Sequence, residues 1–124
     1  MLIFLYKSEV LDLHHQIIEA FGGSFGLRDE GALESALMAA KNRASYENAD
    51  LAICAATYAF HLTQAHAFVD GNKRIAAAVS EVFVELNGGS LRATNDQLVN
   101  LFLAIAAGQM TREDVADVFI EWLK

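Results

Sequence analysis

Apolar residues recur three and four positions apart along most of the chain, which is the spacing of one face of an α-helix. The first such segment follows Ser8, a favourable N-cap, and ends at the glycine pair 22–23. Its apolar positions are Val10, Leu11, Leu13, Ile17, Ile18 and Phe21. A glycine-rich loop over residues 22–26 follows, and Asp29 can then cap a second, short helix. The apolar positions of that helix are Leu33, Ala36, Leu37 and Ala40.

The middle of the chain predicts two longer helices with a break between them. The first begins at Asn48 or Asp50 and runs to about Ala65. It is rich in alanine, whose small side chain lets neighbouring helices approach closely. The pattern breaks at residues 66–70, and the next helix covers about residues 71–86. These two helices are therefore expected at the centre of the fold.

Two further helices are predicted after Asn87-Gly88-Gly89, which ends the preceding one. Thr94 and Gln97 have the spacing of a capping box, and the helix that they open ends at Gly108. Thr111 begins the last helix, which has acidic residues in its first turn. Its apolar positions are Val115, Val118, Phe119, Trp122 and Leu123.

Together these segments predict an all-α fold, a compact bundle of about six helices that forms a single domain over residues 1–124. A chain of this size buries roughly two-thirds of its unfolded surface, which is enough for one core. The apolar stretch 1–6 favours a short extended segment. We expect it to pair with residues 89–93 in a minor β-hairpin.

Composition and charge exclude several classes of protein. Hydrophobic residues make up 54% of the chain against 20% charged, which argues against intrinsic disorder. The longest uncharged run, residues 51–69, contains two histidines and a glutamine and is a poor membrane span. A net charge of −7 opposes binding to nucleic acid or anionic lipid. With a lone cysteine, Cys54, and no secretion leader, we expect a cytoplasmic protein without membrane or nucleic-acid partners.

Two adjacent cations, Lys73 and Arg74, stand where the fourth predicted helix begins. They are the only lysine and arginine between residues 44 and 91. Cations are normally disfavoured there, because the free N–H groups and the dipole make a helix N-terminus positive. Their position therefore predicts a bound anion. The surrounding string, residues 66–74 (His-Ala-Phe-Val-Asp-Gly-Asn-Lys-Arg), adds an imidazole, a carboxylate, a glycine and an amide.

These groups suit phosphoryl or nucleotidyl transfer, in which positioning and charge neutralisation carry most of the catalysis. Gly71 lets the backbone approach a phosphate, and the amides of residues 71–74 can form an anion-binding nest. Lys73 offers a point charge and Arg74 a bidentate fork. Asp70 can cap the helix or hold a Mg²⁺ ion that bridges phosphates.

His66 can take a proton from an attacking hydroxyl at neutral pH. Each side chain also has a structural interpretation: His66 as a loop or core histidine, Asp70 as an N-cap, and the two cations as a solvated face paired with Glu81. Phe68 is most simply a hydrophobic anchor for the loop. A metal site of His61, His66 and Asp70 is an alternative whose spacing matches no familiar zinc pattern. The other histidines are assigned to structure: His14, His15 and His61.

At this segment the sequence resembles the Fic/Doc superfamily. The signature residues present here are His66, Phe68, Asp70, Gly71, Asn72, Lys73 and Arg74. Residues 21–23, 26–29 and 33–37 also look like the N-terminal blocks of the short death-on-curing (Doc) branch. Two positions depart from the usual pattern: Ala67 replaces the proline of Fic proteins, and Gly71 is Fic-like where some Doc members carry alanine.

The resemblance implies an activity, because the residue before the final arginine separates the two branches. Fic proteins usually have glycine there and transfer AMP from ATP to a protein hydroxyl. With Lys73 this chain resembles the Doc type, in which ATP binds in reversed orientation and its γ-phosphate passes to a threonine of elongation factor Tu, halting translation. By that resemblance His66 activates the hydroxyl and Asp70 holds Mg²⁺. Asn72 then contacts a phosphate or the loop, and Lys73 and Arg74 bind phosphate.

The resemblance also implies a regulatory partner. Fic proteins are often restrained by their own inhibitory helix, whose Ser/Thr-x-x-x-Glu-Gly/Asn pattern does not occur in this sequence. Restraint is therefore expected from an antitoxin whose disordered tail folds into a helix along a groove on the toxin. Two hypotheses remain beside a phosphotransferase toxin: AMP transfer, and a catalytically idle domain in which the motif only clamps a loop.

Overall fold

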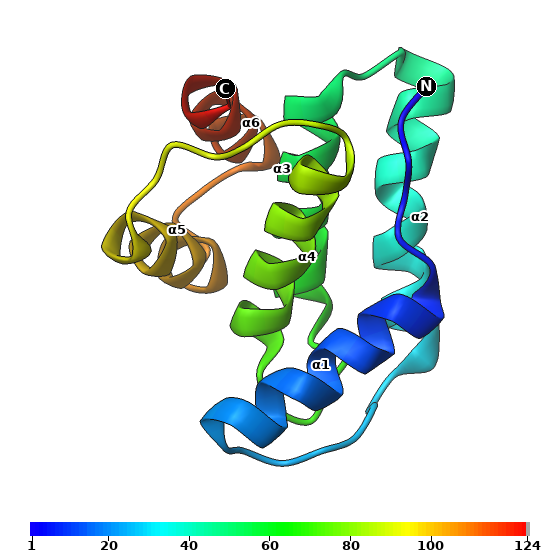
Figure 1. The fold of residues 1–124 in the computed structure, drawn as a ribbon, viewed down its shortest axis with the longest axis vertical. Helices are drawn as coiled ribbons and strands as arrows, with labels where there is room; N and C mark the ends of the chain where they lie inside the picture. Colours follow the sequence, from blue (N-terminus) through cyan, green and yellow to red (C-terminus); the bar gives the residue numbers. More distant parts are fainter. Residues whose placement is uncertain (124) are drawn as a thin grey trace.

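The structure is a computed structural model that describes residues 1–123. Within this range the chain forms six α-helices (Figure 1): α1 (Lys7–Phe21), α2 (Glu30–Glu47), α3 (Leu51–Ala65), α4 (Asn72–Leu86), α5 (Asn95–Ala106) and α6 (Arg112–Trp122). The predicted all-α bundle is confirmed. Among the described residues, no helix is both long enough and apolar enough to cross a membrane.

The alanine-rich helix α3 lies at the centre of the bundle. It contacts α2, α4, α5 and α6, and α1 crosses the end of α4 at which the chain enters from α3 (Figure 1). Four buried alanines allow this close packing, Ala52, Ala55, Ala56 and Ala59. Cys54 is also fully buried, and burial raises the pKa of its thiol to about 11, so the thiol stays protonated at neutral pH. The central helices therefore fix the relative positions of the ends of α3 and α4.

The helix boundaries follow the predicted caps closely. At four helix starts the side-chain oxygen of the N-cap residue accepts a backbone N–H of the first turn. These N-cap residues are Asp29, Asp50, Thr94 and Thr111. The first helix begins earlier than predicted, with Tyr6 and not Ser8 as its N-cap, because the Glu9 carboxylate accepts the Tyr6 N–H at 2.7 Å. Helix α2 is 18 residues long and ends only at the left-handed Asn48, so the expectation of a short helix is wrong.

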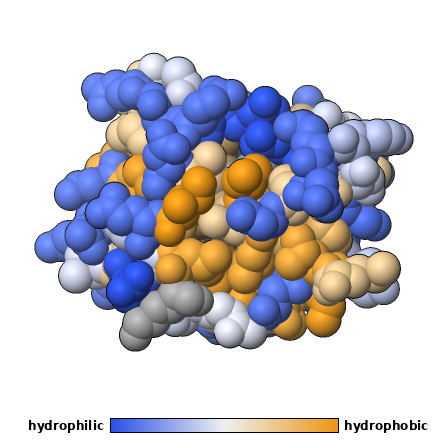
Figure 2. All heavy atoms as spheres, turned by 90° about the horizontal axis from the view of Figure 1, so that it is seen from above, coloured by the Kyte–Doolittle hydropathy of each residue, from blue (hydrophilic) through white to orange (hydrophobic). Residues whose placement is uncertain are grey.

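The predicted β-hairpin is not formed within residues 1–123, where the only bridges are isolated ones. The extended N-terminal segment pairs with a side chain instead: the Asn87 amide accepts the Ile3 N–H and donates to the Ile3 carbonyl. The segment around Leu91 bridges to Leu123 at the end of α6. Figure 2 shows apolar side chains gathered at this end of the molecule, where Met1 and Ile3 are exposed.

Candidate active site

The loop between α3 and α4 carries the string that the sequence analysis singled out. Helix α3 ends at Ala65, and His66 turns the chain in the left-handed region with φ +48°. Gly71, with φ +74°, makes the second left-handed turn and is the N-cap of α4. A residue with a side chain is strained in that conformation, which explains the glycine. Two left-handed residues thus reverse the chain within five positions.

Phe68 and Asn72 fix the shape of this loop. The Phe68 side chain is buried, with 2% of its surface exposed, as the anchor interpretation predicted. The Asn72 amide accepts the Phe68 N–H and donates to the Phe68 carbonyl, both at 3.0 Å. The sequence left two roles open for Asn72, contact with a phosphate or contact with the loop. The structure shows its contact with the loop.

The segment between α1 and α2 packs along the same loop. Leu27 and Phe68 form an antiparallel bridge, and the Val69 N–H donates to the Gly26 carbonyl at 3.1 Å. The guanidinium of Arg28 donates to the His66 carbonyl at 2.6 Å. The main chain of the loop is therefore held by the segment between α1 and α2, through backbone hydrogen bonds and the Arg28 side chain.

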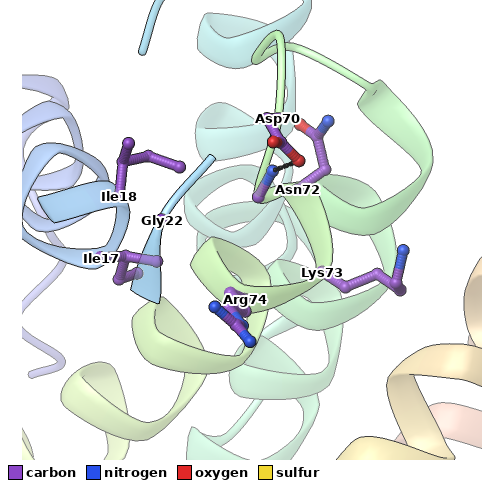
Figure 3. A pocket seen from close by; sticks show the side chains of 8 residues that line it. Ile17, Ile18, Gly22, Asp70, Asn72, Lys73 and Arg74 are labelled. Atoms are coloured by element: carbon purple, nitrogen blue, oxygen red, sulfur yellow. Dashed lines mark hydrogen bonds between the residues drawn. The ribbon is translucent and has the colours of Figure 1, made fainter. Parts of the chain in front are cut away.

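A cavity of about 290 Å³ opens at the start of α4 (Figure 3). It brings five of the predicted site residues together: Asp70, Gly71, Asn72, Lys73 and Arg74. Its opposite wall comes from the end of α1, through Ile17, Ile18 and Gly22. Figure 3 shows Arg74 on the side of α4 that faces Ile17, with Lys73 extending from the other side. The cavity therefore lies between the start of α4 and the end of α1.

The start of α4 has the properties of an anion site. Among the described residues no side chain caps it, so the first N–H groups of the helix stay available to a ligand. Lys73 and Arg74 are exposed, and neither forms an ion pair within residues 1–123. The Arg74 guanidinium instead lies 4.5 Å above the centre of the Phe21 ring. Positive charge at this helix start is thus not neutralised by the described part of the protein.

Among residues 1–123, Asp70 supplies the only carboxylate that lines this cavity. One of its oxygens accepts the Gly71 N–H at 2.8 Å, and the other accepts the Ser24 N–H at 3.2 Å. These two backbone hydrogen bonds, that from Gly71 first, lower the pKa of Asp70 below its ordinary value. Of the two roles that the sequence left open for Asp70, helix cap or Mg²⁺ ligand, the cap is not formed, because Gly71 is the N-cap of α4 and the Asp70 carboxylate accepts the N–H groups of Gly71 and Ser24. The carboxylate stays ionised throughout the neutral range.

His66 does not line the cavity. Its backbone is held by Arg28, and its side chain is exposed at the end of α3. His61 lies within α3, where burial lowers its imidazole pKa. No group of three metal-ligating side chains occurs within residues 1–123, so the alternative metal site of His61, His66 and Asp70 is not formed.

A second, larger groove of about 570 Å³ adjoins the cavity, since both are lined by Ile17, Lys73 and Arg74. It runs between α4 and α5 and is mostly apolar. The remaining lining residues are Phe21, Ala77, Ala78, Glu81, Asn95, Leu98, Val99, Phe102 and Leu103. Burial raises the pKa of the Glu81 carboxyl, which is the only acidic group that the described part of the chain places in this groove.

Sequence reasoning missed the contacts that other segments make with the loop. His14 of α1 and the backbone of Ser24 both contact Asp70. A signal for His14 was present: it stands four residues from both Val10 and Ile18, on the apolar stripe of α1, and all three are buried. The contact of Ser24 had no such signal, because every residue except proline has a backbone N–H, so the sequence does not identify which one donates.

Comparison with known proteins gives consistent results. A model described as the Fic/DOC family matches residues 4–84. The chain is 32% identical over 110 residues to a protein named protein kinase doc from Escherichia phage P1, covering 88% of this chain and 86% of that protein. It is 40% identical over 81 residues to a protein named Toxin Doc from Mycolicibacterium smegmatis, covering 62% of this chain and 61% of that toxin.

Proposed function

Because this chain belongs to the Fic/DOC family, we propose that it is a toxin that transfers the γ-phosphoryl group of ATP to a hydroxyl of a target protein. The observation that carries the proposal is the cavity at the start of α4, where an uncapped helix N-terminus and two unpaired cations meet an ionised carboxylate. The names of the two relatives, a protein kinase and a toxin, agree with it.

In this proposal the start of α4 holds the phosphates of ATP. The N–H groups of the first turn and the Arg74 guanidinium face the cavity from one side, and Lys73 adds charge beside them. Charge that develops on the phosphoryl oxygens is stabilised by donors that are already in place. Gly71 supports this arrangement, since its backbone turns without a side chain between the helix start and the ligand.

His66 would accept the proton of the target hydroxyl. The hydroxyl oxygen forms a bond to the γ-phosphorus, the bond from that phosphorus to the β-γ bridging oxygen breaks, and ADP leaves. The hydroxyl proton passes to the imidazole, which is exposed and therefore accessible to a protein substrate. Arg28 keeps the His66 backbone in place during this step.

The cavity suits a Mg²⁺ ion that arrives with the nucleotide. Mg²⁺ is usually held by one or two carboxylates, by phosphate oxygens and by water. Asp70 provides one carboxylate, and each of its oxygens keeps a lone pair beyond the N–H bond that it accepts. The bound ion would neutralise phosphate charge. No second acidic residue lines the cavity, so phosphate and water would supply the other ligands.

The proposed chemistry is tested by following each end of the triphosphate. The purified protein is incubated with elongation factor Tu, the target that we propose from the family resemblance, and with γ-labelled or α-labelled ATP in parallel. We expect label on the factor from γ-labelled ATP only, and none when Mg²⁺ is chelated. Label from the α position alone would establish AMP transfer instead. If neither label is transferred to this or any added protein, the enzymatic proposal fails.

We further propose that an antitoxin tail folds as a helix in the groove between α4 and α5. Val99 and Leu103, which line it, are 56% and 50% exposed, as expected for a face that a partner covers. Glu81 and the net charge of −7 favour a tail that carries basic residues. A helix there would lie beside Lys73 and Arg74, where it also blocks the phosphate cavity.

A charge placed in this groove should abolish rescue by the antitoxin. Toxin variants are co-expressed with the antitoxin that protects cells from the wild-type toxin, and growth is measured. Val99→Arg is expected to stay toxic despite the partner, because its guanidinium is then buried against apolar residues. Ile120→Arg is the control, since Ile120 on α6 is equally exposed but lies outside the groove. Equal rescue of both variants would place the partner elsewhere.

A methyl group at Gly23 should disable the site without unfolding the protein. Gly23 and Gly108 both have positive φ, so alanine strains the backbone at either position. At Gly23 the new Cβ would lie 2.7 Å from an Asp70 carboxylate oxygen, which must then move, whereas at Gly108 it meets open space. Misplacement of a catalytic group by about 1 Å can cost about 100-fold in rate. We expect Gly23→Ala to lose phosphoryl transfer and Gly108→Ala, outside the cavity, to retain it at similar Tm; equal rates would contradict the assigned role of Asp70.

A further inference from the structure

His14 is unlike the other buried polar side chains of the described range. Three buried hydroxyls donate to carbonyls four residues earlier in their own helices, those of Thr57, Thr63 and Ser80. The imidazole of His14 is 3% exposed and contacts a residue 56 positions away, the carbonyl of Asp70. Its hydrogen bond therefore leaves α1 and reaches the loop of the candidate active site.

Three observations place this imidazole against the loop. Its Nε2 lies 2.7 Å from the Asp70 carbonyl oxygen. Its ring stacks on that of Phe68, with 3.8 Å between the ring centres and 14° between the planes. A Cβ built on Gly71 would lie 3.5 Å from the same Nε2. One side chain from α1 therefore contacts two loop residues, Phe68 and Asp70, and occupies the space beside Gly71.

The hydrogen bond defines the chemical state of the ring. A carbonyl oxygen can only accept, so Nε2 must carry a proton and donate it. His14 consequently has its proton on Nε2, whatever the state of Nδ1.

This bond also sets the direction of the next donor along the chain. A trans peptide group is planar, and its carbonyl and N–H point in opposite directions. Fixing the Asp70 carbonyl therefore fixes the Gly71 N–H of the same plane, which donates to an Asp70 carboxylate oxygen at 2.8 Å (dashed in Figure 3). The imidazole thus acts on the carboxylate through a single rigid group.

We propose that His14 is a positioning residue for Asp70: through the Asp70–Gly71 peptide plane, its imidazole orients the carboxylate that faces the phosphate cavity. This role rests on the proposed function, because it assigns Asp70 to Mg²⁺ and nucleotide. Groups that orient a metal-binding side chain from behind are commonly worth about 10- to 100-fold in metal affinity or activity.

Two substitutions and a neighbouring control separate orientation from packing. His14→Phe keeps an aromatic ring over Phe68 but loses the donor, and His14→Gln keeps an N–H donor at similar reach. His15→Gln is the control, because the His15 side chain is 62% exposed and pairs with Glu19, four residues further along α1. We expect His14→Phe to raise the Mg²⁺ concentration for half-maximal activity about 10-fold or more, with partial recovery in His14→Gln.

Nuclear magnetic resonance tests the proposal without catalysis. In the wild-type protein the imidazole nitrogens of His14 should show a protonated Nε2, and the Gly71 amide resonance should move in His14→Phe but not in His15→Gln. An unprotonated Nε2 in the wild type would overturn the proposal even if every His14 variant failed to fold. An unchanged Mg²⁺ requirement in folded His14→Phe would also overturn it. Absence of phosphoryl transfer in the wild type would instead refute the proposed function. The resonances of His14 and Gly71 would still show whether the imidazole orients the peptide group.

Discussion

His66→Ala is expected to lower the rate of phosphoryl transfer by about 100- to 10,000-fold, which is the usual contribution of a positioned general base. The imidazole is the proposed acceptor of the hydroxyl proton, and no histidine lines the phosphate cavity to replace it. ATP binding should change little, since His66 does not contribute to the cavity wall. The measurement is the initial rate of transfer from γ-labelled ATP, beside the affinity for ATP.

The backbone at His66 calls for a second variant. Its φ of +48° strains alanine, so a loss of activity in His66→Ala could come from a distorted loop. Asparagine tolerates the left-handed conformation and cannot act as a base at neutral pH. His66→Asn should therefore be folded and inactive, and its expression should not inhibit growth. Full growth inhibition by this variant would show that the protein acts by binding alone, as the idle-domain hypothesis holds.

Phe68→Ala is expected to cost about 3–5 kcal/mol of unfolding free energy, the range for truncation of a fully buried aromatic residue. The ring fills the space beneath the loop and stacks on His14, so its loss leaves a cavity between α1 and the loop. That cost is a large part of the stability of a domain, which is typically about 5–15 kcal/mol. Urea denaturation measures it, through a lower midpoint at constant slope.

Phe25→Ala is the matched control for this substitution. Phe25 lies in the segment between α1 and α2, is 52% exposed and packs with a tilted ring against the exposed His15. Its truncation should cost less than about 1 kcal/mol, because it removes little buried surface. If the two variants were equally stable, the loop would not depend on its aromatic anchor, and its shape would have to come from the Asn72 clamp and the contacts with residues 26–28.

The sequence predicted the helices well where capping is local. Asp29, Asp50, Thr94 and Thr111 each cap a helix within three residues of themselves, and that geometry depends on little else. The β-hairpin could not be excluded in the same way. The hairpin does not form because Ile3 pairs with the Asn87 side chain, 84 positions away. Pairings between such distant residues are set by the whole fold.

The candidate site was predictable as a string of residues but not as an arrangement. Gly71 and the two cations belong to one helix start, so proximity in sequence already placed them together. The opposite wall, formed by the end of α1, has no counterpart in the motif. Nor did the sequence indicate that Asp70 would be held by a backbone donor from the loop before α2, because any residue at position 24 except proline offers the same N–H.

The close packing of α3 against α4 has a consequence for control of the proposed enzyme. The six residues that join these helices are anchored by Phe68, clamped by Asn72 and bridged to Leu27, so the span from His66 to the start of α4 is held by several contacts. A rearrangement of the loop would have to break these contacts together, which opposes local opening. If the loop keeps this shape without nucleotide, a partner that occludes the cavity would be enough to silence the proposed enzyme, and removal of that partner would free a site that is already assembled.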